Sequence, residues 1–336
     1  MSANSGMLPF PCIIGSGRSG TTLLRSMLDS HPDVAVPGES NWLGRVVRIR
    51  RRLEAGGVLD VDGFTRVLAN PAYEFRTRWQ LEPLEARNAV EAASAGTVAD
   101  AVRAVYAAYA RGKGKLRYGE KMPGFARSVD ALGAMLPELR FIHLVRDGRD
   151  VALSYLDVPF GPTTIGDGAI WWRKQVMAAR AAGTRIGAAR YLELRYEDLV
   201  DDPPQTLHRM CRFLELDYNE AMLDYTARAD ELLDTVRSEA HSGLRRPPTP
   251  GLRDWRSTLA PGEVALFEAI AGDALDEFGY PRVRPSVTPG VRLRAAGARS
   301  RYWFRRAQFA GRRVRGRARR EWTRRSILRT QHDGQQ

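Results

Sequence analysis

The sequence contains few cysteines and no long apolar run. Its 336 residues include only Cys12 and Cys211, too few for a disulfide framework and typical of a reducing compartment. No stretch approaches 18 uninterrupted apolar residues, which argues against a membrane span. The first eleven residues lack the basic and apolar regions of a signal peptide. We therefore expect a cytoplasmic protein, long enough to bury a large core without disulfide or metal cross-links.

Lysine is also scarce, and the basic charge is uneven along the chain. Of 52 basic residues only four are lysines, and 15 of the arginines lie in residues 292–329 beside a single acid. That segment carries a net charge of +14, whereas the whole chain carries +13, so the rest is close to neutral. This distribution argues against nucleic-acid binding by the body of the protein. We predict a domain over residues 1–285 and an Arg-rich C-terminal arm over residues 286–336.

The arm mixes its arginines with aromatic residues such as Trp303 and Trp322. This mixture is typical of a basic amphipathic helix lying on an anionic membrane, here the inner membrane surface. A disordered, solvated arm is the simpler interpretation of this composition and is favoured over membrane contact. Contact with nucleic acid or an acidic partner is a third, less favoured interpretation.

Short apolar runs alternate with helical patterns along the rest of the chain. The runs predict strands at residues 10–15, 116–118, 140–145 and 191–194. Strands separated by helices indicate βαβ units and a parallel sheet. We therefore predict an α/β, P-loop-like three-layer fold with a mainly parallel central sheet of about four or five strands. Residues 40–112 are mostly helical in pattern, and we also expect a mobile helical cap on the fold.

A glycine-rich loop follows the first predicted strand and opens a helix. Residues 15–22 read GSGRSGTT, which fits the spacing G-x-x-x-x-G-K-[ST] except that Thr21 stands at the lysine position. Free N–H groups and the helix dipole at such a place can hold a phosphate or sulfate. Without the lysine, ATP is a poor ligand, whereas Arg18 offers a planar fork for an oxyanion. A strand-to-helix turn without a ligand is the alternative.

The loop and residues 141–154, which read FIHLVRDGRDVALS, resemble the two signature segments of sulfotransferases that use 3′-phosphoadenylyl sulfate (PAPS). The resemblance implies that the first segment binds the 5′-phosphosulfate through Arg18, Ser19, Gly20, Thr21 and Thr22. It also implies that Arg146 and Ser154, at the family's eight-residue spacing, bind the 3′-phosphate. Both would lie at the carboxyl edge of a parallel sheet, where such folds bind ligands. The alternative for Arg146 is a salt bridge to Asp147 or Asp150.

Sulfuryl transfer to a hydroxyl needs a base and positive charge around the moving group, and arginine and lysine can supply that charge without a metal. The segment from Arg18 to Glu39 resembles tyrosylprotein sulfotransferases and related bacterial enzymes, which implies Glu39 as the general base. Arg18 would hold the sulfuryl charge, and Lys121 matches a family lysine that stabilises the transition state. The alternatives are a helix N-terminal carboxylate for Glu39 and a solvated surface lysine for Lys121.

Two later segments complete the resemblance. Tyr196 is similar to a family tyrosine near the nucleotide, with a tyrosine at the sheet edge as the alternative. Trp255 lies in a segment that resembles the one folding over the nucleotide. The chain departs from tyrosylprotein sulfotransferases at Arg253, where they have a serine, and at Val158, where they have an arginine. Whether Arg253 or Arg256 replaces these contacts stays open.

We predict a sulfotransferase that transfers the sulfuryl group of PAPS to an acceptor hydroxyl without a metal. The acceptor would be a carbohydrate, a lipid-linked compound, a small aromatic compound or a tyrosine. The alternative enzyme is an atypical P-loop kinase acting on a small molecule, disfavoured by Thr21 and by Asp147 being the only candidate Mg²⁺ ligand at a strand end. A third interpretation is a non-catalytic protein that binds acidic polymers or membranes through its arm.

Overall fold

Four parallel strands form the central sheet of the computed structural model, which describes residues 7–234, 242–247, 249, 254–283, 287–305 and 307. The strand order is β4-β1-β5-β6, and every pairing is parallel. The strands are β1 (Phe10–Gly15), β4 (Glu120–Lys121), β5 (Leu139–Val145) and β6 (Tyr191–Arg195). Because β1 and β5 are apolar and buried along almost their whole length, they form the middle of the sheet. The predicted α/β fold with a parallel sheet is confirmed.

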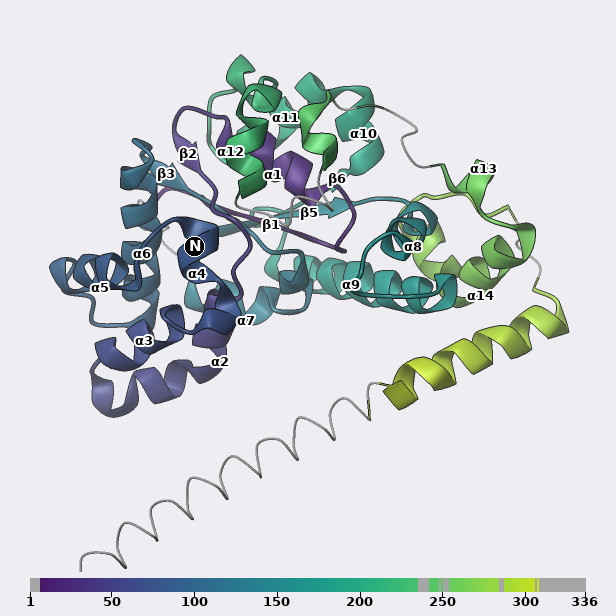
Figure 1. Ribbon diagram of the computed structural model, residues 1–336, viewed down its shortest axis with the longest axis horizontal. Coiled ribbons are helices and arrows are strands. Elements are labelled where there is room, and N and C mark those ends of the chain that lie inside the picture. The colour runs from purple at the N-terminus through teal and green to yellow at the C-terminus, as the bar shows by residue number, and fades with distance from the viewer. Residues whose placement is uncertain are drawn as a thin grey trace, which may run out of the picture.

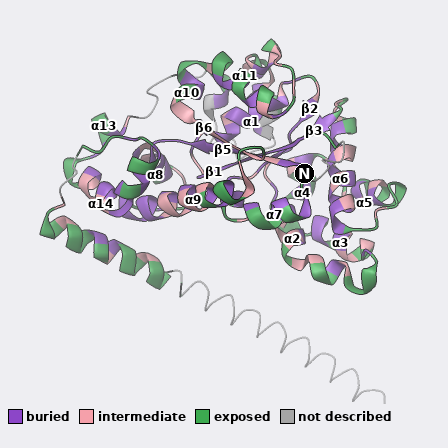
Figure 2. Cartoon of the chain, turned by 180° about the vertical axis from the view of Figure 1, so that it is seen from behind, coloured by how far each residue is buried: buried purple, intermediate pink, exposed green. Residues whose placement is uncertain are grey.

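Helices cover both faces of this sheet, and alternate residues of β1 and β5 pack into the cores on its two faces. Ile13, Ile142 and Leu194 face one helical layer, whereas Cys12 and Phe141 face the other. The first layer contains α1 (Thr21–Asp29), α10 (Tyr196–Asp201), α11 (Pro203–Phe213) and α12 (Ala229–Asp234). The second contains α7 (Val129–Met135), α8 (Gly148–Leu156), α9 (Ile165–Ile186) and α14 (Pro261–Glu277) (Figure 1). Seen by burial, the strands lie between helices that expose only their outer sides (Figure 2).

A helical insertion, residues 42–112, forms the predicted cap beside the sheet (Figure 1). Its helices are α2 (Trp42–Leu53), α3 (Val61–Leu68), α4 (Phe75–Trp79), α5 (Pro83–Ala92) and α6 (Val98–Gly112). Trp42, fully buried, contacts Phe64, Phe75, Trp79 and Tyr106 at ring-centroid distances of 5.4–6.0 Å. Edge-on aromatic packing of this kind adds to the stabilisation from apolar burial. The insertion therefore has an aromatic core of its own.

The insertion starts and ends at a second, small parallel sheet. β2 (Val34–Ala35) pairs with β3 (Arg117–Tyr118), so the chain returns to its starting point after the insertion. Tyr106 on α6 packs against Phe10 of β1 at 4.7 Å and against Tyr118 of β3 at 5.6 Å. These contacts fix the insertion to the edge of the main sheet.

Most predicted elements are present, with differences where elements are short. The predicted strand near residues 116–118 is β3, which lies outside the main sheet, while the two-residue strands β2 and β4 were not predicted. Between α11 and α12 the chain forms two 3-10 turns, Glu220–Met222 and Tyr225–Arg228. Two-residue strands carry no periodicity that a sequence pattern can reveal.

Residues 289–305 form a helix at the start of the predicted arm. Ala295 and Ala298 are buried in the same core as α9 and α14, and Arg305 forms a 2.9 Å ion pair with Asp167 of α9. The domain boundary at residue 285 stays a prediction, and residues 308–336 lie outside the described residues. Within the described part of the chain, no helix is both long and apolar enough to cross a bilayer.

Trp42 is the aromatic centre of the insertion, so its truncation tests how much the insertion contributes to folding. We expect Trp42→Ala to lower the free energy of unfolding by about 3–5 kcal/mol, as for other buried aromatic side chains. Urea unfolding followed by circular dichroism measures this change. Trp303→Ala, at a side chain that is 55% exposed, is the control and should lower it by less than about 1 kcal/mol. Equal effects of the two substitutions would contradict the central position of Trp42.

Candidate functional site

The glycine-rich loop connects β1 to α1 through two left-handed residues. Arg18 has φ 70° and Gly20, the N-cap of α1, has φ 86°. Such a conformation turns successive backbone N–H groups toward one side and is strained for a residue other than glycine. The Ser19 hydroxyl is buried and has no hydrogen-bond partner among the described residues. Unsatisfied N–H and O–H donors of this kind fit an oxyanion.

The loop has no room for side chains at its glycines. A Cβ atom at Gly17 would lie 2.4 Å from the Tyr155 hydroxyl, and one at Gly20 would lie 2.3 Å from the Tyr196 ring. Tyr155 belongs to α8, and Tyr196 is the first residue of α10. The loop is therefore packed between two tyrosines that come from elements following β5 and β6.

The first and second signature segments meet directly. The Arg18 Nε donates a 3.1 Å hydrogen bond to the Ser154 Oγ on α8. This contact is possible because β1 and β5 pair in parallel with Gly15 opposite Leu144, so residues 16–22 and 146–154 leave the sheet at the same edge. The predicted ligands of the two phosphate groups thus lie side by side.

Arg146 follows β5 and is 8% exposed. Its guanidinium lies 4.5 Å from the centroid of the Tyr196 ring, and its Nε has no hydrogen-bond partner among the described residues. The Nη2 is 3.6 Å from a carboxylate oxygen of Asp150, so the ion pair weighed as the alternative for Arg146 is present. At that distance the pair is electrostatic and leaves hydrogen-bond donors available for an oxyanion.

Glu39 and Lys121 form an ion pair next to the loop. Lys121, in the edge strand β4, is fully buried, and its Nζ also donates to the Thr22 Oγ1 at 3.3 Å. Burial lowers the pKa of the Lys121 ammonium, and the charge of Glu39 counteracts this effect. The interpretation of Lys121 as a solvated surface lysine is therefore wrong. Its ammonium lies between the carboxylate of Glu39 and the start of α1.

Two hydrogen bonds join the segment around Glu39 to the helical insertion. The Gly38 N–H donates to the Arg78 carbonyl oxygen at 3.3 Å. The Ser40 hydroxyl, almost fully buried, donates to the Tyr73 carbonyl oxygen at 2.6 Å. The glutamate therefore stands between two anchored residues, while its own side chain is 41% exposed.

A cavity of about 400 Å³ opens in front of these groups. Arg18, Thr22 and Glu39 line it together with residues of the insertion, the 122–124 turn, α8, the loop after α8, and α9: Tyr73, Glu74, Arg78, Met122, Tyr155, Phe160, Trp171 and Gln175. Trp171 thus contributes to a cavity, whereas its neighbour Trp172 is buried in the core. A larger hollow of about 780 Å³ lies between α2 and α7, away from every predicted site residue.

Trp255 is the predicted site residue that lies apart from the loop. It is buried, its ring is 3.8 Å from the Arg149 guanidinium, and its indole N–H donates to Asp147 at 3.1 Å. Arg256 is paired with Asp254 at 3.7 Å on the surface, and Arg253 lies outside the described residues.

Sequence reasoning missed two buried groups near the site. Arg149, with no exposed surface, forms ion pairs with Asp147 at 2.7 Å and Glu268 at 2.8 Å. Glu120, the strand neighbour of Lys121, accepts a hydrogen bond from Tyr106, and burial raises its pKa to about 7. The only hints in the sequence were that Arg149 lies inside the second signature segment and that Glu120 directly precedes Lys121. Glu268, more than a hundred residues away, gave none.

These features coincide with a match to a known family. The model of the sulfotransferase family matches residues 11–220, and the chain belongs to this family. Protein-tyrosine sulfotransferase 2 of Gallus gallus is 27% identical over 285 residues, covering 81% of this chain and 70% of the relative. Nodulation protein NoeE of Sinorhizobium fredii (strain NBRC 101917 / NGR234) is 26% identical over 308 residues, covering 83% and 68%. The protein is thus an enzyme, a sulfotransferase, and the family implies PAPS as the donor.

Solved structures agree with this assignment. The sulfotransferase domain from the Synechococcus PCC 7002 olefin synthase superposes with a TM-score of 0.58 at 26% identity, over 83% of this chain and 98% of that domain. The sulfotransferase domain from the curacin biosynthetic pathway gives a TM-score of 0.57 at 19% identity, over 82% and 99%, and shares the fold. The predicted family and enzyme class are therefore confirmed.

The contact of Gly17 with Tyr155 yields a prediction with a built-in rescue. We expect Gly17→Ala to weaken binding of adenosine 3′,5′-bisphosphate by about tenfold or more, because overpacking costs about 1–3 kcal/mol. Tyr155→Phe removes the clashing hydroxyl, so Gly17→Ala/Tyr155→Phe should regain most of the affinity. Isothermal titration calorimetry on the three variants measures this. A double variant as weak as Gly17→Ala would show that the hydroxyl is not the obstacle.

Proposed function

We propose that the protein transfers the sulfuryl group of PAPS to the hydroxyl of an acceptor that enters the 400 Å³ cavity. One observation carries the proposal. The loop, Ser154, Glu39 and Lys121 come from four separate segments and meet at one edge of the sheet. A loop that only turns the chain would need neither the Arg18–Ser154 contact nor a buried lysine beside it.

The donor would be held by the chain at two anionic positions. The N–H groups at residues 20–22 and the Ser19 hydroxyl suit the 5′-phosphosulfate, with Arg18 beside it. Arg146 and Ser154 suit the 3′-phosphate, since the buried guanidinium has a donor without a partner. Tyr196 supports both positions, because its ring contacts Gly20 and lies under Arg146. Trp255 lies apart from the loop and would act on this site through Asp147, which accepts its indole N–H and is the chain neighbour of Arg146.

Bound PAPS supplies an activated sulfuryl group and a phosphate leaving group. Glu39 would accept the acceptor's hydroxyl proton while the acceptor oxygen forms its bond to sulfur and the bond from sulfur to the phosphate oxygen breaks. Lys121 contacts both Glu39 and Thr22, so its ammonium can stabilise negative charge on the phosphate oxygen as Glu39 becomes neutral. Arg18 would stabilise the charge of the moving group. Lys121 and Arg18 would then supply the positive charge that the reaction needs, without a metal.

The acceptor side of the cavity combines aromatic and polar side chains. Trp171 and Phe160 offer flat apolar surfaces, while Gln175 and the Arg78–Glu74 ion pair offer hydrogen-bonding groups. The cavity's volume suits a small hydroxyl compound or the end of a larger one. A carbohydrate, a lipid-linked compound, a small aromatic compound and a tyrosine all fit this description.

Contact with an anionic membrane through the arm remains part of the proposal. The exposed aromatic side chains of Trp303 and Phe304 lie among arginines at the end of the helix over residues 289–305. This combination suits peripheral binding to anionic lipids at the inner membrane surface of the cytoplasm. Nucleic acid is the less favoured anionic partner, because the excess charge lies in the arm alone.

Arg146→Ala tests the donor site. A ligand that binds only the native state raises its melting temperature, so adenosine 3′,5′-bisphosphate should stabilise the unaltered protein and ATP with Mg²⁺ should not. We expect Arg146→Ala to weaken bisphosphate affinity by about tenfold or more, since a charge-assisted contact to phosphate is lost. Thermal-shift titration measures both effects.

The matched control is Arg140→Ala, at the opposite end of the same strand, where Arg140 pairs with Glu215. Its bisphosphate affinity should stay within about twofold of the unaltered protein, because distant sites act independently. Stabilisation by ATP with Mg²⁺ alone would contradict the proposed donor. Unchanged bisphosphate affinity in Arg146→Ala would move the 3′-phosphate to other residues.

Glu39→Gln tests the base. Turnover should fall by about 10²- to 10⁴-fold, the usual contribution of a general base, while bisphosphate affinity is kept. Release of adenosine 3′,5′-bisphosphate from PAPS is measured with the best acceptor from a panel of phenols, sugars and alkyl alcohols. Glu74→Gln, which removes the same charge from another residue that lines the cavity, is the control and should lose far less. Turnover of Glu39→Gln within threefold of the unaltered rate would exclude Glu39 as the base.

A further inference from the structure

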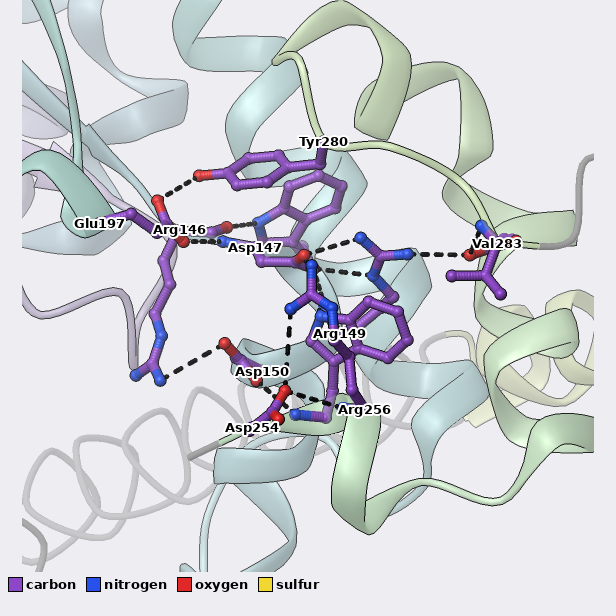
Figure 3. Close-up of polar contacts among 12 residues, drawn as sticks. Arg146, Asp147, Arg149, Asp150, Glu197, Asp254, Arg256, Tyr280 and Val283 are labelled. Atoms are coloured by element: carbon purple, nitrogen blue, oxygen red, sulfur yellow. Dashed lines mark hydrogen bonds and ion pairs between the residues drawn. The ribbon is translucent and has the colours of Figure 1, made fainter. Parts of the chain in front are cut away.

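The surroundings of Arg146 are unusual for a residue that is to bind a phosphate. Its guanidinium is almost fully buried above Tyr196, and an acidic side chain, Asp150, faces it from the first turn of α8. Figure 3 shows the two side chains pointing toward one another, and the Arg146 Nη2 lies 3.6 Å from the Asp150 Oδ2. A carboxylate in this position partly neutralises the charge that is to attract the donor.

Asp150 uses its two oxygens for different partners. Its Oδ2 faces Arg146, and its Oδ1 accepts a 2.9 Å hydrogen bond from the backbone N–H of Trp255. The side chain is only 15% exposed, so neither interaction is fully screened by water. A single carboxylate therefore joins the second signature segment to the segment that carries Trp255.

Trp255 is also held by contacts that do not involve Asp150. Its indole N–H donates to the Asp147 carboxylate, and its ring lies against the Arg149 guanidinium. Arg149 is in turn fixed by Asp147 and by Glu268 of α14. Removing only the charge of Asp150, while keeping an oxygen that accepts from the Trp255 N–H, should leave this segment in place.

We propose that Asp150 is a counter-ion of Arg146 whose negative charge limits the affinity of the guanidinium for the donor's 3′-phosphate. The inference rests on the proposed function, because it takes Arg146 as a ligand of that phosphate. The physical reason is that a phosphate binding to Arg146 approaches the carboxylate, and like charges at short distance repel in a partly buried site. Product release benefits, since the bisphosphate that leaves carries the same 3′-phosphate.

The charge of Asp150 depends on pH within an accessible range. Burial raises the pKa of Asp150 to about 6, Arg146 and the Trp255 N–H lower it, and the Asp147 and Glu197 carboxylates raise it. As the pH falls through about 6, Asp150 gains a proton and its repulsion of phosphate disappears. A bound phosphate raises the pKa of Asp150 further, so binding should be accompanied by proton uptake that depends on this residue.

The experiment compares Asp150→Asn and Asp150→Ala with the unaltered protein in binding of adenosine 3′,5′-bisphosphate at pH 7.5. Asp150→Asn should bind about three- to tenfold more tightly, the size expected from one partly screened charge. Asp150→Ala also loses the Trp255 contact and should bind more weakly than Asp150→Asn. Asp198→Asn removes a charge from an exposed position on α10 and should stay within twofold.

Calorimetry in buffers with different ionisation enthalpies gives the second readout. At pH 6.5 the unaltered protein should take up more protons on binding than Asp150→Asn, because only the unaltered protein has the Asp150 carboxylate, which gains a proton as the phosphate approaches. Equal or weaker binding by Asp150→Asn, or equal proton uptake, would overturn the counter-ion role. If the counter-ion role is overturned but the unaltered protein binds the bisphosphate and Arg146→Ala does not, the proposed function still stands. Absence of binding to the unaltered protein would overturn both.

Discussion

The parallel pairing of β1 with β5 is the constraint on which the site depends. Parallel strands end at the same edge, and here the register places Gly15 opposite Leu144. The loop after β1 and the start of α8 after β5 therefore emerge together, which allows Arg18 to reach Ser154. The pairing of β1 with β4 extends this arrangement, because Lys121 lies beside Ile13 and its ammonium reaches the start of α1. The segments at the ends of β1, β4 and β5 therefore meet at one edge of the sheet without a long loop.

The sequence allowed the middle of this sheet to be predicted, because β1 and β5 are mainly apolar and are followed by polar signature segments. The short strands β2 and β4 could not be recognised, since two residues show no period. Which contacts the site residues make was also beyond the sequence. The Arg18–Ser154 bond requires a left-handed backbone at Arg18, and the pairing of Glu39 with Lys121 depends on how the chain returns after the insertion.

The cationic side chains of this site form ion pairs with carboxylates of the protein itself. Arg149 is enclosed by two carboxylates, Lys121 pairs with Glu39, and Arg146 faces Asp150. Removing one partner of such a pair is costly when both are buried, because the remaining charge is left without compensation. The arrangement explains how several cations remain close together before a polyanionic donor binds. It also means that each acid next to these cations affects how strongly the donor is attracted.

The anchoring of Glu39 to the helical insertion has a consequence for the way such a protein can diversify. Both bonds that hold its neighbours end on carbonyl oxygens of the insertion, at Tyr73 and Arg78, and not on side chains. The side chains of this segment of the insertion can therefore be exchanged by mutation without loss of these two hydrogen bonds. Because Glu74 and Arg78 also line the cavity, the wall that meets a new acceptor can diverge while the carboxylate keeps its place. Selection for a different acceptor need not start by rebuilding the reacting centre.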